Sequence, residues 1–120
     1  MTHDTREGAT CGMTDRFVSP ETPPEGLERE LLTILAEECC EVGQRVSKAL
    51  RFGLSEVQPG QSLTNAQRIA LEAGDLIAMV KMLEERGVLD RHEVTAAVQA
   101  KRRKVARFLQ STEHAPTTGG

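Results

Sequence analysis

Apolar side chains recur at three- and four-residue steps between positions 27 and 50, and this spacing constrains the fold more than any other feature of the chain. The positions are Leu27, Leu31, Ile34, Leu35, Cys39, Val42, Val46, Ala49 and Leu50. An α-helix turns once every 3.6 residues, so this period lines up the apolar side chains along one face. The pattern therefore predicts an amphipathic helix that ends near Arg51.

Two further helices are predicted downstream, each with its own start signal. Thr64 and Gln67 have the spacing of a capping box, and apolar residues then recur as far as a stop at Gly87. Asp90 and Glu93 give a similar capping signal for a third helix. The intervening segment 52–62 carries two Gly and a Pro and is predicted to be a loop. Because nothing alternates as a strand, the predicted fold class is all-α.

The 120 residues suit one domain with a thin core. Trp and Tyr are absent and there are three Phe, so burial relies on aliphatic side chains, and self-association would complete such a core more easily. Residues 1–24 are rich in Thr, Gly and Pro and are predicted to be an extended or partly disordered arm. We expect the helical domain to span 25–110 and a flexible tail to span 111–120.

The net charge of −3 hides two opposite patches. Segment 25–41 holds six carboxylates and one Arg, whereas 101–107 holds five cations and no acid. No helix-turn-helix or zinc-finger pattern accompanies the basic run, which argues against nucleic-acid binding. Adjacent Cys39 and Cys40 suit a normal disulfide poorly and indicate a reducing cytoplasm. No apolar run approaches the length of a membrane span, and no secretory signal pattern is expected at the N-terminus.

Two pairs of carboxylates at i,i+3 spacing are the main candidates for chemistry. Glu38 and Glu41 lie in the first predicted helix, with Glu37 beside them, and Glu72 and Asp75 lie in the second. Residues three apart are separated by about 60° around a helix, so each pair shares a face. Three interpretations are open: a solvated face, a salt-bridged face, or a metal site.

The surroundings of the second pair favour the metal interpretation. Glu72 and Asp75 stand in the apolar stretch "IALEAGDLIAMV", where uncompensated carboxylates are costly, and only Arg68 could pair with them locally. Oxygen-only donors favour Mg²⁺ or Mn²⁺. Gly74 between the two acids suggests close helix packing. A ferritin-like di-iron site is disfavoured because it requires Glu-x-x-His motifs, which the chain lacks.

The acidic motifs resemble a known signature. "EECCE" at 37–41 followed by "EAGD" at 72–75 resembles the EExxE and ExxD motifs of the MazG-like family of all-α nucleoside triphosphate pyrophosphatases. The resemblance extends through "SKALRFG" at 47–53 and covers roughly 27–108. It implies an antiparallel helical bundle completed by oligomerisation, as a homodimer or homotetramer. It also implies hydrolysis of a (d)NTP to the monophosphate and pyrophosphate with Mg²⁺ or Mn²⁺, two or three ions per site.

The resemblance also assigns roles to residues. It implies that Glu38, Glu41, Glu72 and Asp75 are metal ligands, and that Glu37 is a further ligand or orients the attacking water, so that Glu37 and Glu38 are the catalytic pair. Lys101 and Lys104, which can point together, are implied phosphate contacts. Lys48 follows Glu37 by about three turns and Arg51 lies roughly one turn further, so each is either a phosphate contact or an ordinary surface cation.

The substrate base is not determined by any motif. Phe17 and Phe52 could stack on a base or belong to the core, so the base-binding residues are unknown. The chain looks like short phage-type members, including the MazZ branch that acts on dGTP and GTP, and we expect a purine substrate such as dGTP; a phage-encoded protein would act in the host cytoplasm. Cys39 and Cys40 lack a nearby His and are expected in the core. The alternative function is a non-catalytic helical interaction module that uses the basic third helix.

Overall fold

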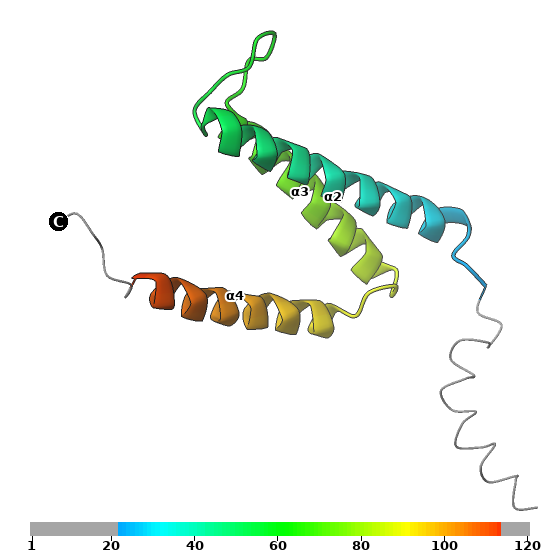
Figure 1. Ribbon diagram of the computed structural model, residues 1–120. Helices are drawn as coiled ribbons and strands as arrows, with labels where there is room; N and C mark the ends of the chain where they lie inside the picture. The colour runs from blue at the N-terminus through cyan, green and yellow to red at the C-terminus, as the bar shows by residue number, and fades with distance from the viewer. Residues whose placement is uncertain (1–21, 114–120) are drawn as a thin grey trace, which may run out of the picture.

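The computed structural model describes residues 22–113, and these form three α-helices (Figure 1). Helix α2 spans Gly26–Phe52, α3 spans Asn65–Glu85 and α4 spans Arg91–Glu113. The only strand-like pairing in this part of the chain is an isolated bridge between Val57 and Thr64 in the α2–α3 connection. The all-α prediction is thus confirmed. The predicted arm falls almost entirely outside the described residues, and α4 continues to Glu113, past the predicted domain end at 110.

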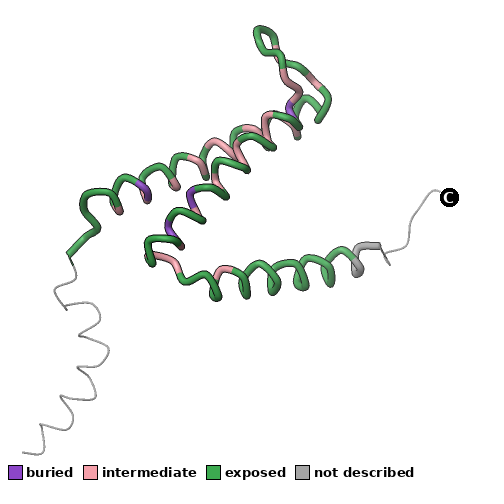
Figure 2. Tube along the Cα trace, turned by 180° about the vertical axis from the view of Figure 1, so that it is seen from behind, coloured by how far each residue is buried: buried purple, intermediate pink, exposed green. Residues whose placement is uncertain are grey.

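Helices α2 and α3 pack against each other as an antiparallel hairpin (Figure 1). The buried core is small: Leu31 of α2 meets Met79 and Leu83 of α3, and Figure 2 shows these few buried positions along the hairpin. Partly buried Leu32, Leu35, Val88 and Leu89 pack around them. This apolar cluster joins the start of α2 to the end of α3, at the opposite end of the hairpin from the α2–α3 loop.

The other end of the hairpin is closed by polar contacts. Gly53 follows the last residue of α2 as its C-cap; its φ of 100° lies in the region that favours glycine, and it donates its N–H to the Ala49 carbonyl. Thr64 and Gln67 form the predicted capping box: the Thr64 hydroxyl accepts from Gln67 N–H at 3.1 Å, and Gln67 Oε1 accepts from Thr64 N–H at 2.9 Å. These contacts set the start of α3 and hence the register of its acidic residues.

A buried asparagine ties the loop to the hairpin. Asn65 is 2% exposed, and its Nδ2 donates to the Gly53 carbonyl and to Glu56 Oε1, both at 2.9 Å. One amide group thus connects the end of α2, the loop and the start of α3. Buried polar groups need such partners, because an unpaired one costs about 1–3 kcal/mol.

Helix α4 departs from the hairpin after the turn at Gly87, where φ is 77°. Asp90 Oδ1 accepts from Glu93 N–H at 3.0 Å, which confirms the predicted cap at this end. Figures 1 and 2 show α4 diverging from α3, and every residue of α4 from Thr95 to Leu109 is exposed. The Cα radius of gyration is 21.8 Å, well above the roughly 12–14 Å of a compact domain of this length.

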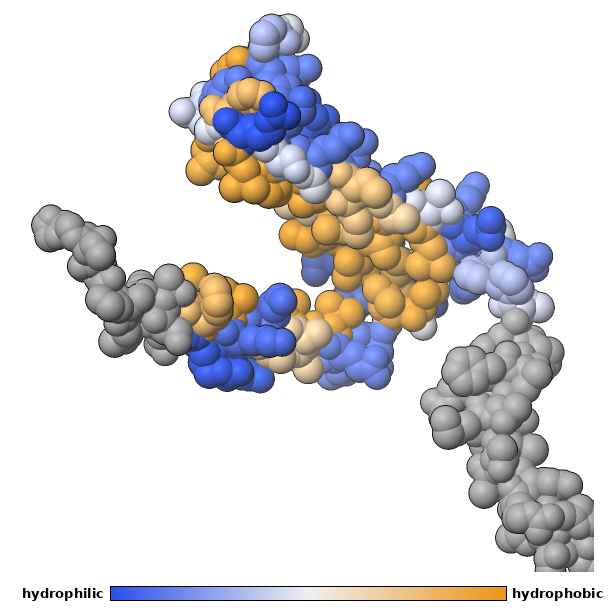
Figure 3. Space-filling view, in the orientation of Figure 1, coloured by the Kyte–Doolittle hydropathy of each residue, from blue (hydrophilic) through white to orange (hydrophobic). Residues whose placement is uncertain are grey.

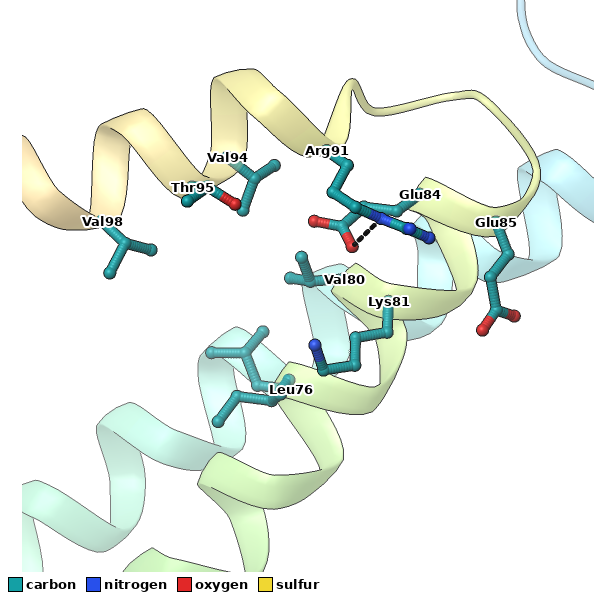
Figure 4. Close-up of a pocket in the computed structure, with 10 residues that line it drawn as sticks. Leu76, Val80, Lys81, Glu84, Glu85, Arg91, Val94, Thr95 and Val98 are labelled. Atoms are coloured by element: carbon teal, nitrogen blue, oxygen red, sulfur yellow. Dashed lines mark ion pairs between the residues drawn. The ribbon is translucent and has the colours of Figure 1, made fainter.

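The helices therefore leave a large apolar area uncovered. Figure 3 shows apolar side chains gathered over α3 and along the side of α4 that faces it. The exposed large apolar side chains of α3 and α4 include Leu71, Ile77, Met82, Val98, Val105 and Leu109. Between the two helices lies an open groove of about 690 Å³, lined by Leu76, Val80, Val94 and Val98 and flanked by the Arg91–Glu84 ion pair (Figure 4).

Two sequence expectations about packing are wrong within the chain. Cys39 and Cys40 are free and exposed rather than part of the core, because they lie about 100° and 200° around α2 from Glu38, away from α3. Gly74 is also exposed, and a Cβ built there would meet nothing within 4 Å. Close packing of α2 on α3 therefore does not explain this glycine.

Candidate metal centre

Three carboxylates from the two helices of the hairpin meet about halfway along it. Glu38 of α2 and Glu72 and Asp75 of α3 each place a carboxylate oxygen so that all three lie within 4.8 Å of one another. Glu72 and Asp75 are one turn apart on α3, and antiparallel packing brings Glu38 opposite them. The cluster lies between the apolar core at one end of the hairpin and the Asn65 contacts at the other.

Glu38 is the carboxylate most affected by this arrangement. Its Oε2 atom is buried and has no hydrogen-bond partner. Its pKa is raised above the ordinary 4.5, first by burial and then by the negative charges of Asp75 and Glu72, with smaller effects from Glu41 and Glu37. The folded protein thus holds a carboxylate whose charge is not compensated by any group of the described chain.

Arg45 is a part of the site that the sequence reasoning missed. It lies seven residues after Glu38, about two helical turns, so it faces α3 on the same side of α2. Its Nε is 3.5 Å from Glu72 Oε1, and its Nη2 is 3.8 Å from Glu41 Oε2. The signal was present in the sequence, since Glu41 and Arg45 have the i,i+4 spacing of a helical ion pair.

The other acidic candidates lie beside the cluster rather than in it. Glu41 is one turn beyond Glu38 on α2, and its carboxylate pairs with Arg45. Glu37 is exposed and lines a separate shallow groove with Leu31 and Ile34. Of the five acidic residues predicted from the sequence, the structure brings together Glu38, Glu72 and Asp75, with Glu41 linked to them through Arg45.

The predicted phosphate-binding cations are distributed over two separate helices. Lys48 is exposed near the end of α2, and the Arg51 guanidinium carbon lies 5.0 Å from the centre of the Phe52 ring. Lys101 and Lys104 are exposed on α4, which diverges from the hairpin that carries the carboxylates (Figure 1). Within one chain the structure therefore does not bring these two lysines to the cluster.

Two further expectations concern residues near the site. Arg68, the one local cation that could pair with the acidic pair on α3, donates instead from Nη1 to Gln58 Oε1 of the loop at 3.0 Å. Phe52 is 48% exposed, so it is not a core residue within the chain. Phe17 lies outside the described residues.

The donor set fits a hard divalent cation. All three converging ligand atoms are carboxylate oxygens, the chemistry that Mg²⁺ and Mn²⁺ prefer, whereas no His or Cys takes part in the cluster. The unpartnered Glu38 Oε2 and the raised pKa of that residue indicate a local deficit of positive charge. A divalent cation would supply this charge.

In residues 22–113, fold and site together define an all-α arrangement: an antiparallel hairpin that carries a three-carboxylate cluster, and a third helix that diverges from it. Comparison of the chain with protein-family models, with curated proteins and with solved structures gives no match. Among the described helices, none combines the length and apolar character needed to cross a bilayer.

Proposed function

We propose that this chain is a divalent-metal-dependent nucleoside triphosphate pyrophosphohydrolase that converts a (d)NTP to the monophosphate and pyrophosphate. The observation that carries the proposal is the meeting of Glu38, Glu72 and Asp75, whose carboxylate oxygens lie within 4.8 Å of one another. The same residues belong to the two acidic motifs that resemble the MazG-like signature. The motifs lie more than thirty residues apart in sequence, and packing of α2 on α3 makes them one site.

Glu38, Glu72 and Asp75 would hold Mg²⁺ or Mn²⁺, with Glu41 as a fourth ligand once it is released from Arg45. Bound metal ions neutralise a triphosphate and lower the pKa of a coordinated water, so that hydroxide forms near neutral pH. For this reaction the chain itself would hold the carboxylates in position, with Glu38 and Glu72 partly buried between α2 and α3. It contributes cations for the leaving pyrophosphate only where these can reach the cluster.

The need for cations close to the carboxylate cluster constrains how copies of the chain would assemble. Lys101 and Lys104 are on α4, which leaves the hairpin, while Lys48 follows the acidic stretch on α2 itself. We propose a homodimer or homotetramer in which the apolar sides of α3 and α4 are covered by other copies of the chain. In such an assembly the basic run 101–107 of one copy can approach the acidic segment 25–41 of another copy. The two segments are opposite in charge.

For the substrate, we propose a purine deoxynucleotide, with dGTP or GTP to be tested first, because the chain resembles short phage-type members that include dGTP-hydrolysing proteins. The described chain offers one aromatic ring near the hairpin's loop end, Phe52, and its ring is already in contact with Arg51. The proposal therefore places base recognition in a residue contributed by another copy or by the N-terminal segment.

One observation favours a second function. The basic stretch 101–107 is exposed throughout and stands off from the hairpin, as expected for a surface that binds an acidic protein. A non-catalytic interaction module of this kind would depend on α4 alone. Its binding would tolerate Glu72→Gln and Asp75→Asn and would not need a metal.

The deciding experiment is product analysis. The full chain is incubated with each NTP and dNTP in the presence of Mg²⁺ or Mn²⁺, and the products are separated. We expect monophosphate plus pyrophosphate, lost on addition of EDTA and in Glu72→Gln. Formation of diphosphate plus orthophosphate contradicts the proposed bond cleavage, and absence of turnover for every nucleotide contradicts the hydrolase proposal.

A further inference from the structure

Arg45 is a positively charged side chain at the proposed metal site, and the metal proposal alone gives it no role. Its side chain is 22% exposed and lies between Glu41 on its own helix and Glu72 on the facing helix. It is the cation that forms ion pairs with the acidic residues of the site within the described chain. Its guanidinium therefore pairs with two of the four carboxylates at the site, those of Glu41 and Glu72.

The contacts of Arg45 are electrostatic rather than tightly directional. Its two distances, 3.5 Å and 3.8 Å, are longer than the 2.7–2.9 Å that is usual for charge-assisted hydrogen bonds. Its buried Nε has no hydrogen-bond partner in the described chain. An arginine is always charged, so its presence lowers repulsion in the cluster without locking any carboxylate in place. Such a contact can be given up at low cost when another cation arrives.

Arg45 compensates the charge of some acidic residues at the site and leaves another without a positively charged partner. Arg45 pairs with Glu41 and Glu72, whereas Oε2 of Glu38 stays unpartnered. Without Arg45, the facing acidic residues of α2 and α3 would have no positive charge between them, and the hairpin would fold against their repulsion. A dication bound at Glu38, Glu72 and Asp75 would supply the same compensation and would be repelled by the guanidinium.

We propose that Arg45 is the internal counterion of the metal-free site: it stabilises the α2–α3 hairpin before a cation binds, and a divalent cation displaces its guanidinium from Glu72 and Glu41. This inference rests on the proposed function, because it takes the carboxylate cluster to be a metal site. In this role Arg45 sets the affinity of the metal-free protein for a divalent cation. Displacement of its guanidinium frees Glu41 to become a ligand.

The test is calorimetric titration of Mn²⁺ into the full chain without nucleotide. We expect Arg45→Gln to bind Mn²⁺ about fivefold more tightly than the wild type, the change expected from losing one partly exposed charge interaction. Arg29→Gln is the matched control, since it removes the same charge from the same helix about 24 Å away. Its affinity should stay within about twofold of wild type.

A second measurement covers the possibility that Arg45→Gln folds poorly. In Arg45→Lys the charge is kept, so Mn²⁺ affinity should stay near the wild-type value. Without metal, Arg45→Gln should melt below the wild type, and the difference should shrink in a Glu72→Gln background, because the two residues then no longer interact.

The outcomes separate this inference from the proposed function. Wild-type protein that binds Mn²⁺ while Arg45→Gln binds it equally or more weakly overturns the counterion role and leaves the metal site standing. An Arg45→Lys variant that binds several-fold more tightly than wild type also overturns it, because charge would then not be the cause. If neither the wild type nor any variant binds Mn²⁺, both the metal site and the competition at Arg45 are wrong.

Discussion

At the scale of single residues, the surroundings of Glu38 disfavour its charged form. Burial and the charges of Asp75 and Glu72 raise its pKa above 4.5, so the folded state binds a proton at Glu38 more strongly than the unfolded state does. The stability that this proton contributes is present in full below pH 4.5 and is lost as the pH rises through the folded-state value. Relative to acidic pH, Glu38 therefore lowers the stability of the metal-free protein at neutral pH.

The first prediction concerns the effect of the Glu38 charge on the stability of the protein. Without metal, Glu38→Gln should melt at a higher temperature than the wild type at neutral pH, and the difference should shrink as the pH is lowered toward 4.5. With Mn²⁺ the order should reverse, because the wild type gains stability from bound metal and the variant does not. Thermal melts at several pH values, with and without Mn²⁺, check both statements. A variant that gains as much from Mn²⁺ as the wild type contradicts a ligand role for Glu38.

The second prediction compares the two adjacent glutamates of α2. Glu38 belongs to the cluster, whereas Glu37 lines a different groove. We expect Glu38→Gln to lower the rate of pyrophosphate release by about 100-fold or more, since even loss of a residue that only supports a metal ligand costs about 10- to 100-fold. Glu37→Gln should lose less than about tenfold. Pyrophosphate release under saturating Mg²⁺ distinguishes them, and equal losses would return Glu37 to the catalytic role that the family resemblance implies.

At the scale of elements, the α2–α3 hairpin holds the site because each of its ends is secured by different chemistry. One end is the apolar cluster around Leu31, Met79 and Leu83, and the other is the loop tied down by Asn65. The carboxylates lie between these two anchors. Their mutual repulsion is therefore opposed by packing on one side and by hydrogen bonds on the other.

The third prediction concerns Asn65. Asn65→Ala leaves the Gly53 carbonyl and Glu56 without their partner and should lower the free energy of unfolding by about 1–3 kcal/mol. Thr64→Ala, which removes only the helix cap, should cost about 1 kcal/mol and serves as the comparison. Chemical denaturation measures both. A cost for Asn65→Ala no larger than that for an exposed loop residue such as Ser55 would show that the loop is not anchored there.

The elements were predictable from the sequence to a large extent, and the reason is local. The capping signals at Thr64 and Asp90 and the stop at Gly87 are short-range features, and each appears at its expected position. Helix α2 ends at Phe52, one residue past the predicted end near Arg51. The meeting of Glu38 with Glu72 and Asp75 was expected from the motif resemblance, and the hairpin's packing brings those three residues together.

What the sequence did not reveal depends on which face each helix turns toward another. Arg45 was overlooked because its role requires knowing that α3 passes next to it, although its spacing from Glu41 was visible. Cys39 was expected in the core because it fits the apolar period, but one neighbouring helix covers only part of that stripe. Periodicity predicts that a face is apolar, not which partner buries it.

At the scale of the whole molecule, the described chain leaves many large apolar side chains exposed on α3 and α4. Val98 is 52% and Val105 is 42% exposed on α4, and Ile77 is 54% exposed on α3 across the groove. Exposed apolar side chains of this kind are the surface that the proposed assembly would cover. The core of the described residues is small: three buried apolar side chains, of which Leu83 alone is fully buried, contribute little toward stability on their own.

The fourth prediction tests the proposed oligomer. Val98→Asp places a charge in the groove between α3 and α4 and should convert the dimer or tetramer to a monomer with lower thermal stability. Gln99→Asp adds the same charge to the adjacent exposed position and is the control, for which we expect the wild-type mass. Sedimentation velocity or light scattering measures the mass. A wild-type protein that is monomeric and fully active would contradict the proposed assembly.

The Val98→Asp variant also tests whether the proposed active site is shared between two copies of the chain. If Lys101 and Lys104 reach the carboxylates only from another copy, the monomeric Val98→Asp should lose turnover along with its partner, while its own cluster still binds Mn²⁺. Mixing it with an excess of Glu72→Gln, which carries intact α4 lysines, should then not restore activity, because Val98→Asp cannot associate. Mixing Glu72→Gln with Lys101→Ala/Lys104→Ala should restore part of it, since each copy supplies what the other lacks. Complementation by the second mixture but not the first indicates a site shared between subunits, whereas activity retained by the Val98→Asp monomer indicates a site that one chain completes by itself.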